Sequence, residues 1–243
     1  MGIIHLISDF QTGSYKAGLL QSRLKQMLEN TDVIDITHDI KPHNIAEAAF
    51  VARHIESYGS APVIVVVSMG EEDNRIIYQQ DMLWYVLPDN GLLYMMFEAP
   101  DASRIFTADS SVFYKALQSI ANGQNPDLPK AVNPEKKFPK KPMVHENMIV
   151  SERIFTDKIG NCYFNITRSE FEGFFEPGKF RARIQYVPGT YFYHISSGLK
   201  DVDPGDSFLT FNSKGYLKLS IHQGSASQLF RIKENTQIII ERI

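Results

Sequence analysis

The first half of the chain alternates between short apolar runs and segments whose apolar residues recur at helical spacing. The runs are typical of strands: 3–8 (IIHLIS), 32–36 (DVIDI), 62–67 (PVIVVV), 82–87 (MLWYVL) and 102–106 (ASRIF). Helical spacing appears over residues 17–28, 45–55 and 113–121, the last ending before Gly123, a plausible C-cap. A strand that is apolar throughout, as in 62–67, is typical of a parallel sheet covered on both faces. The pattern therefore predicts a mainly parallel α/β/α sandwich.

The pattern changes after residue 125. Residues 126–142 contain five prolines and five lysines, which predicts an exposed linker over 126–143 between an N-terminal domain (1–125) and a C-terminal domain (144–243). The last hundred residues hold short alternating runs separated mostly by turn residues: RIFTD, KFRARIQYV, SFLTFN, GYLKLSI and QIIIERI. This is typical of an antiparallel β-domain.

Composition narrows the class of protein. The 243 residues are 43% hydrophobic, enough for a sizeable core, and the net charge of −3 does not favour a nucleic-acid partner. Cys162 is the only cysteine, so an internal disulfide and a thiolate metal cluster are excluded. No apolar run approaches the roughly 20 residues that span a bilayer, and the N-terminus resembles a first strand rather than a signal peptide. We expect a soluble cytoplasmic protein without a membrane partner.

Polar loops follow three of the predicted strands, at 9–15, 37–44 and 68–75. Ligands of open α/β sheets bind beyond the carboxyl ends of the strands. Asp9 is either a carboxylate that binds a ribose diol or the cap of the next helix. His38, between two aspartates, is a base, a metal ligand or a structural histidine that ties a turn together. The histidines lack metal-ligand spacing and no glycine-rich phosphate loop is present, so we expect no metal.

Five motifs together resemble one family. They are SDF (8–10), IDITHDI (34–40), PDNGLL (88–93), DKIGNCYFNI (157–166) and PGDSFLTFNSKGYLKLSIHQGSA (204–226). In this order they are similar to the S-adenosyl-L-methionine hydroxide adenosyltransferases, relatives of the fluorinase and chlorinase enzymes. The resemblance implies an N-terminal α/β domain, a C-terminal β-barrel-like domain and a homotrimer that binds its ligand between subunits. It also implies attack of a nucleophile on ribose C5′, with methionine leaving and no cofactor; water as nucleophile gives adenosine.

The resemblance assigns ligand-binding positions in both domains. Asp9 matches the ribose carboxylate, and Ser14 stands where a second aspartate is usual. Asp157 and Asn161 match positions that bind the amino-acid and base portions, and Ile159 and Tyr163 form the apolar wall beside them. The backbone of Ser225 and Ala226 matches the stretch that lines the adenine. From the residues alone, DKIGN is also typical of a tight turn joining two strands.

The positions that activate water depart from the family pattern. Ser68 replaces an aspartate and Thr107 a histidine, while Arg75 stands where the family has its arginine. Glu71, Glu72 or Asp73 would supply a carboxylate from another point on the loop. Three interpretations follow: a hydrolase with altered water activation, which we favour, an adenosyltransferase that uses another nucleophile such as halide, or a non-catalytic adenosyl-ligand binding protein.

Overall fold

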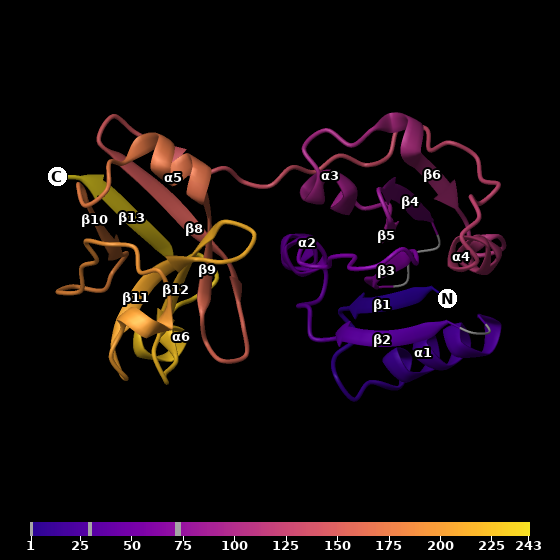
Figure 1. Ribbon diagram of the computed structural model, residues 1–243, viewed down its shortest axis with the longest axis horizontal. Helices are drawn as coiled ribbons and strands as arrows, with labels where there is room; N and C mark the ends of the chain where they lie inside the picture. Colours follow the sequence, from indigo (N-terminus) through magenta and orange to yellow (C-terminus); the bar gives the residue numbers. More distant parts are fainter. Residues whose placement is uncertain (1, 29–30, 71–73) are drawn as a thin grey trace. The chain divides into compact units, whose positions relative to one another are not determined.

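The computed structural model describes residues 2–28, 31–70 and 74–243, so Glu71, Glu72 and Asp73 lie outside the described part. The chain divides into two compact units, Met1–Pro139 and Lys140–Ile243 (Figure 1). The division falls inside the segment predicted as a linker. Part of that segment pairs with the first unit, since Thr107 N donates to Pro129 O at 3.0 Å and Ala131 N to Ile105 O at 3.1 Å.

A six-stranded sheet forms the centre of the N-terminal unit. Its strand order is β2 (Asp32–Thr37), β1 (Ile3–Ser8), β3 (Val63–Ser68), β5 (Leu83–Pro88), β4 (Arg75–Gln80) and β6 (Ile105–Ala108). β2, β1, β3 and β5 run parallel, whereas β4 is antiparallel to both of its neighbours. The prediction of a mainly parallel sheet is confirmed.

Helices cover both faces of this sheet, as Figure 1 shows. α1 (Tyr15–Met27) and α4 (Phe113–Ala121) share one apolar cluster with alternate strand residues such as Leu6, Val66 and Ile77. α2 (Ile45–Ala52) and α3 (Leu92–Met96) share the other with Ile7, Val67 and Ile76. Neighbouring residues on a strand point to opposite faces, so each strand contributes to both clusters. This alternation decides which site residues can meet.

Two local features of the N-terminal unit differ from the sequence prediction. Residues 102–104 of the predicted strand ASRIF form a short 3₁₀ turn (η1, Ala102–Arg104), because the Asp101 carboxylate accepts hydrogen bonds from the N–H and hydroxyl of Ser103. The strand β4 was not predicted. It begins at Arg75, directly after a polar loop, and ends in Gln79 and Gln80, so its apolar part is too short to show the strand pattern.

The C-terminal unit is a curled antiparallel sheet that forms a half-barrel. Its order is β10 (Phe180–Ile184), β13 (Gln237–Arg242), β8 (Met148–Thr156), β9 (Cys162–Thr167), β12 (Tyr216–Ile221) and β11 (Ser207–Phe211), and β7 (Met143–Val144) pairs with β8. The 192–196 segment contacts both edge strands, because Phe192 pairs with Ala182 of β10 and Ile195 with Leu209 of β11. The barrel-like domain implied by the resemblance is confirmed.

The core of this barrel is aromatic and aliphatic. Phe164 and Phe180 are among its largest buried side chains, and Phe171 of α5 (Arg168–Phe174) packs against Phe180 with ring centroids 5.0 Å apart. β8 is long enough to pair with β13 through its first half and with β9 through its second. α6 (Ala226–Leu229) packs against β12 through the buried Ala226. The loop between β8 and β9 lies next to the start of α6, since Ser227 N donates to Gly160 O at 2.9 Å.

None of the helices in the described part of the chain is long and apolar enough to cross a membrane.

Candidate functional site

Three polar loops meet at the carboxyl edge of the N-terminal sheet. β1 lies between β2 and β3, with Ile7 opposite Thr37 and Ser8 opposite Ser68. The strands therefore end side by side, and the loops that follow them lie together, as expected for a ligand edge of an α/β sheet.

Hydrogen bonds to the Asp9 carboxylate connect all three of these loops. One carboxylate oxygen (Oδ2) accepts a hydrogen bond from His43 N at 3.1 Å and the other (Oδ1) accepts one from Gly70 N at 3.1 Å. The residue is only 8% exposed. The helix-cap alternative is wrong, because Ser14 Oγ accepts the bond from Lys16 N that caps α1. Each oxygen of a carboxylate has a second lone pair, so Asp9 keeps acceptor capacity for a ligand hydroxyl.

His38 is a structural histidine in this molecule. Its ring is buried, with Nδ1 at 2.7 Å from Ser8 Oγ and Nε2 at 3.2 Å from Asp35 Oδ1. Its carbonyl accepts a hydrogen bond from Gln11 N at 2.7 Å, and the next residue, Asp39, accepts one from Thr12 N at 2.7 Å. His38 and Asp39 therefore fix the loop that carries Asp9 and Ser14. Among the described residues, no group of three His, Cys, Asp or Glu side chains could hold a metal ion.

Two of the three predicted water-activating residues lie together. Ser68 is buried at the end of β3, and Arg75 begins β4 on the far side of β5. The guanidinium reaches across, donating from Nη1 to Val67 O at 3.0 Å and from Nη2 to Ser68 Oγ at 3.4 Å. Its Cζ lies 5.3 Å from the centre of the Phe113 ring, a cation–π distance. Arg75 thus fixes the end of β3 and places a positive charge beside Ser68.

Thr107 belongs to the opposite face of the sheet. It pairs with Ile76, which lies in the cluster under α2 and α3, whereas Ala108 is the residue opposite Arg75. The next residue of β6, Ala108, lies in the apolar cluster under α1 and α4. It is therefore on the same face of the sheet as Arg75 and Phe113. Strand alternation therefore turns the Thr107 side chain away from Ser68 and Arg75, and the structure does not bring the predicted set of three together.

In the C-terminal unit, the Asp157 carboxylate organises the turn between β8 and β9. Its Oδ1 accepts bonds from the backbone N–H of Ile159 at 3.1 Å and of Asn161 at 2.9 Å. Its Oδ2 accepts bonds from the Asn161 side-chain amide at 2.8 Å and from the Tyr163 hydroxyl at 3.2 Å. DKIGN is therefore a tight turn, and the same contacts bring together three predicted ligand-binding side chains. Burial, the nearby negative charge of Asp157 and this hydrogen bond raise the pKa of Tyr163, so it remains a phenol.

This turn packs tightly against α6. Gly160 has a φ of +94°, and its carbonyl accepts a hydrogen bond from Ser227 N at 2.9 Å. A Cβ at Gly160 would stand 2.0 Å from Ser225 Oγ, so only glycine fits. Ser225 caps α6 by accepting from Gln228 N at 3.3 Å. Ile159 at the tip of the turn is 71% exposed, so its side chain is open to a ligand.

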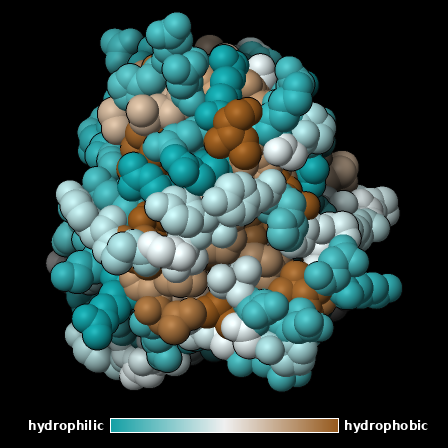
Figure 2. Space-filling view, turned by 90° about the vertical axis from the view of Figure 1, so that its left-hand side faces the viewer, coloured by the Kyte–Doolittle hydropathy of each residue, from teal (hydrophilic) through white to brown (hydrophobic). Residues whose placement is uncertain are grey.

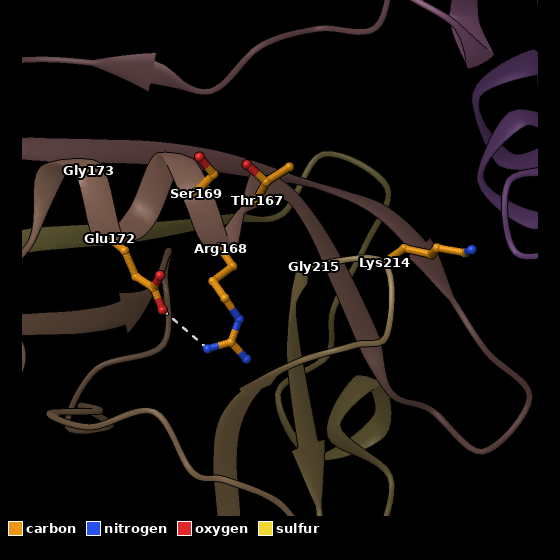
Figure 3. A pocket seen from close by; sticks show the side chains of 7 residues that line it. All are labelled: Thr167, Arg168, Ser169, Glu172, Gly173, Lys214 and Gly215. Atoms are coloured by element: carbon orange, nitrogen blue, oxygen red, sulfur yellow. Dashed lines mark hydrogen bonds and ion pairs between the residues drawn. The ribbon is translucent and has the colours of Figure 1, made fainter.

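A surface hollow of about 610 Å³ lies elsewhere in the C-terminal unit, at the start of α5. Figure 3 shows Arg168 directed toward Glu172, with which it forms an ion pair at 3.2 Å, and the Lys214 side chain extending away from them. The guanidinium of Arg168 also lies 4.7 Å from the centre of the Phe211 ring. None of the predicted site residues lines this hollow, so it adds nothing to the ligand site.

Both units match the models of one protein family. Residues 4–126 match the SAM (S-adenosyl-L-methionine) hydroxide adenosyltransferase N-terminal domain, and residues 152–239 match the C-terminal domain of the same family. The chain belongs to the SAM hydroxide adenosyltransferase family. The resemblance inferred from the motifs is therefore confirmed.

Two curated relatives and a solved structure are similar to this chain over nearly its whole length. The (R)-S-adenosyl-L-methionine hydrolase of Methanocaldococcus jannaschii is 26% identical, covering 96% of this chain and 93% of the relative. The enzyme of the same name from Thermus thermophilus is 22% identical, covering 97% and 98%. An uncharacterized conserved protein from Thermotoga maritima has the same fold, with a TM-score of 0.80, 22% identity and coverage of 98% and 100%.

Sequence reasoning missed two backbone groups of the site. The N–H groups of His43 and Gly70 bind Asp9, and both residues have a left-handed backbone, with φ of +61° and +64°. A glycine directly after a strand is a signal for such a turn, and Gly70 carries it. His43 carries no such signal, because histidine adopts many backbone conformations and only the folded loops require a positive φ here.

Proposed function

We propose that this chain hydrolyses S-adenosyl-L-methionine to adenosine and methionine, by attack of water on ribose C5′. The observation that carries the proposal is the position of Asp9 at the carboxyl edge of the sheet. There, backbone N–H groups from the two neighbouring loops hold both carboxylate oxygens. A carboxylate so oriented suits a vicinal diol, and the hydrolase names of the two curated relatives support the substrate.

In the proposed trimer, the N-terminal unit of one subunit and the C-terminal unit of the next supply the ligand contacts. Asp9 binds the ribose, and Ser14 offers one hydroxyl where a second carboxylate would offer two acceptors. Asp157, Asn161, Ile159 and Tyr163 bind the amino-acid and base portions, and the backbone of Ser225 and Ala226 lines the adenine. The sulfonium is already a good leaving group, so the reaction needs alignment of water with the C5′–S bond rather than a cofactor.

Ser68 and Arg75 have an orienting role in this proposal. Arg75 remains a cation at ordinary pH and the Ser68 hydroxyl is neutral, so neither is a base near pH 7. Their contact at 3.4 Å instead presents hydrogen-bonding groups at the edge where water would stand. Thr107 has no part in the water site that we propose, because its side chain lies on the other face of the sheet.

Isotope labelling tests the proposal directly. We expect the purified protein, incubated with S-adenosyl-L-methionine in H₂¹⁸O, to release adenosine carrying one ¹⁸O at its 5′ oxygen, as measured by liquid chromatography and mass spectrometry. The control is the same incubation without protein, which measures uncatalysed breakdown. Tight binding of adenosine or S-adenosyl-L-methionine without adenosine release contradicts hydrolysis and favours a non-catalytic binding protein. A 5′-halogenated nucleoside formed in the presence of halide would show that halide, rather than water, is the nucleophile.

Restoring a carboxylate at position 68 should increase the rate modestly. In Ser68→Asp the new side chain meets the Arg75 guanidinium, which already contacts that position. A carboxylate paired with arginine is a weak base, so it supplies only a small part of the 10²–10⁴-fold effect of general base catalysis, about threefold. The initial rate of adenosine release measures this effect. Thr107→His serves as the control and should leave the rate unchanged. A larger increase in Thr107→His than in Ser68→Asp would contradict the conclusion that Thr107 lies on the other face of the sheet.

We propose a homotrimer in the cytoplasm, as the resemblance and the composition suggest. Figure 2 shows apolar residues gathered in places among hydrophilic ones on the face that it presents. Large apolar side chains such as Tyr15 in the N-terminal unit and Tyr186 in the C-terminal unit are exposed. The single buried thiol of Cys162 is compatible with a reducing compartment.

A further inference from the structure

We propose that the imidazole of His43 is the base that accepts the proton of the attacking water. The inference rests on the proposed hydrolysis and names the group that the altered water-activating set lacks. It follows from the place of His43 in the folded loops.

His43 lies at the same edge of the sheet as the predicted ribose carboxylate. Its backbone N–H donates to Asp9 Oδ2 at 3.1 Å, so the residue directly contacts the side chain that binds the ribose. Its ring extends over the next loop: Cε1 is 3.7 Å from the position that a Cβ would take at Gly70. Gly70 follows Ser68 by two residues. The imidazole therefore lies between the loop that carries Asp9 and the loop after β3.

The ring of His43 is available for chemistry, in contrast to the buried His38. The side chain is exposed, and within the described ranges neither ring nitrogen has a hydrogen-bond partner. Both nitrogens of His38 are engaged, by Ser8 and Asp35. In the described part of the surrounding loops, the charged groups are Asp9, Asp39, Lys41 and the cation Arg75 at the start of β4; Glu71, Glu72 and Asp73 lie outside the described residues. Asp9 and Asp39 each accept backbone hydrogen bonds, and neither cation can act as a base at neutral pH.

The backbone of His43 supports a functional reason for this residue. Its φ of +61° lies in the left-handed region, which residues other than glycine adopt uncommonly, although histidine does so more often than most. Such conformations persist only where the surrounding structure requires them, and they concentrate at functional sites. Here the conformation directs the N–H toward Asp9. Asparagine or glycine would satisfy the backbone as well, so the backbone alone does not require an imidazole.

The proposed step is balanced. The water oxygen forms a bond to C5′ while the C5′–S bond breaks. The electron pair of the C5′–S bond moves to sulfur, which gives the neutral thioether of methionine. The water proton passes to the unprotonated nitrogen of the His43 ring and is later released to solvent. Histidine is suited to this because it is the side chain that most often acts as a general base in enzymes.

The test compares His43→Asn and His43→Phe with the wild type. Asparagine tolerates the left-handed backbone, and phenylalanine keeps a flat ring without nitrogens. We expect both to slow adenosine release by about 10²–10⁴-fold, the usual range for a general base, and to abolish the fall in rate at low pH that this proposal predicts for the wild type. Adenosine affinity by calorimetry should change less than about threefold, because the N–H to Asp9 remains. His145→Asn, at an exposed histidine of the C-terminal unit, is the control.

Each outcome decides the proposal. A variant that folds, by circular dichroism, and keeps the wild-type rate and low-pH fall overturns it while leaving hydrolysis intact. Retention of the rate in His43→Phe alone also overturns it, since the ring shape and not the nitrogen would then matter. A wild type that binds adenosine but releases none from S-adenosyl-L-methionine overturns both this inference and the proposed hydrolysis.

Discussion

Replacing Asp9 by alanine is expected to weaken adenosine binding by about ten- to a hundredfold and to destabilise the N-terminal unit. Loss of a charge-assisted bond to the ribose diol costs about 1.5–3 kcal/mol, which gives that range of affinity. The same change leaves the N–H groups of His43 and Gly70 without their carboxylate partner. Since Asp9 is 8% exposed, water replaces it incompletely, and each orphaned donor costs about 1 kcal/mol or more. The expected loss of unfolding free energy is therefore about 2–4 kcal/mol.

Calorimetry measures the affinity, and urea unfolding followed by Trp84 fluorescence measures the stability. Trp84 is the only tryptophan and is buried in the N-terminal core, so its signal reports on this unit. Asp101→Ala is the matched control, because Asp101 also accepts hydrogen bonds from a neighbouring residue, Ser103, but lies exposed on the surface. This variant should lower the unfolding free energy much less than Asp9→Ala and leave adenosine binding unchanged. Equal losses of adenosine affinity and of unfolding free energy in both variants would contradict the role proposed for Asp9.

The fold was predictable because periodicity reports directly on burial. The apolar run 62–67 predicted a central strand, and β3 is buried along its whole length with a parallel strand on each side. The alternating runs after residue 144 predicted antiparallel strands, and these form the barrel. β9 was not predicted as a separate strand because CYFNIT shows little alternation; four of its six residues are buried and the other two are half-buried.

The site was only partly predictable, because its geometry depends on register and face. Sequence motifs placed Ser68, Arg75 and Thr107 in one set, yet a strand reverses its side-chain direction at every residue. Arg75 stands opposite Ala108, so Thr107 faces the other helix layer. Similarly, the partners of Asp9 are backbone N–H groups 34 and 61 residues away. No spacing rule predicts them, because they come together only when the loops after three strands meet.

Replacing Gly160 by alanine is expected to lower the unfolding free energy of the C-terminal unit by roughly 3 kcal/mol or more. The φ of +94° is unfavourable for any residue with a Cβ. The new methyl group would also stand 2.0 Å from Ser225 Oγ and 2.8 Å from its Cβ, so the turn and α6 must separate. Separation breaks the bond from Ser227 N to Gly160 O and shifts Asp157 and Asn161, so adenosine affinity should fall as well.

The Gly178→Ala variant separates the cost of a positive φ from the cost of the contact with Ser225. Gly178 has a φ of +72°, but no atom lies within 4 Å of an added Cβ, so this variant carries the backbone cost alone, about 1 kcal/mol. The only thiol, Cys162, reports the difference. Burial raises the pKa of Cys162 to about 11, so in the folded unit it is rarely a thiolate and reacts slowly with a disulfide reagent at pH 8. Opening of the unit restores an ordinary pKa, so the reaction should be much faster in Gly160→Ala than in Gly178→Ala. Equal rates in the two variants would mean that the contact with Ser225 does not limit this position.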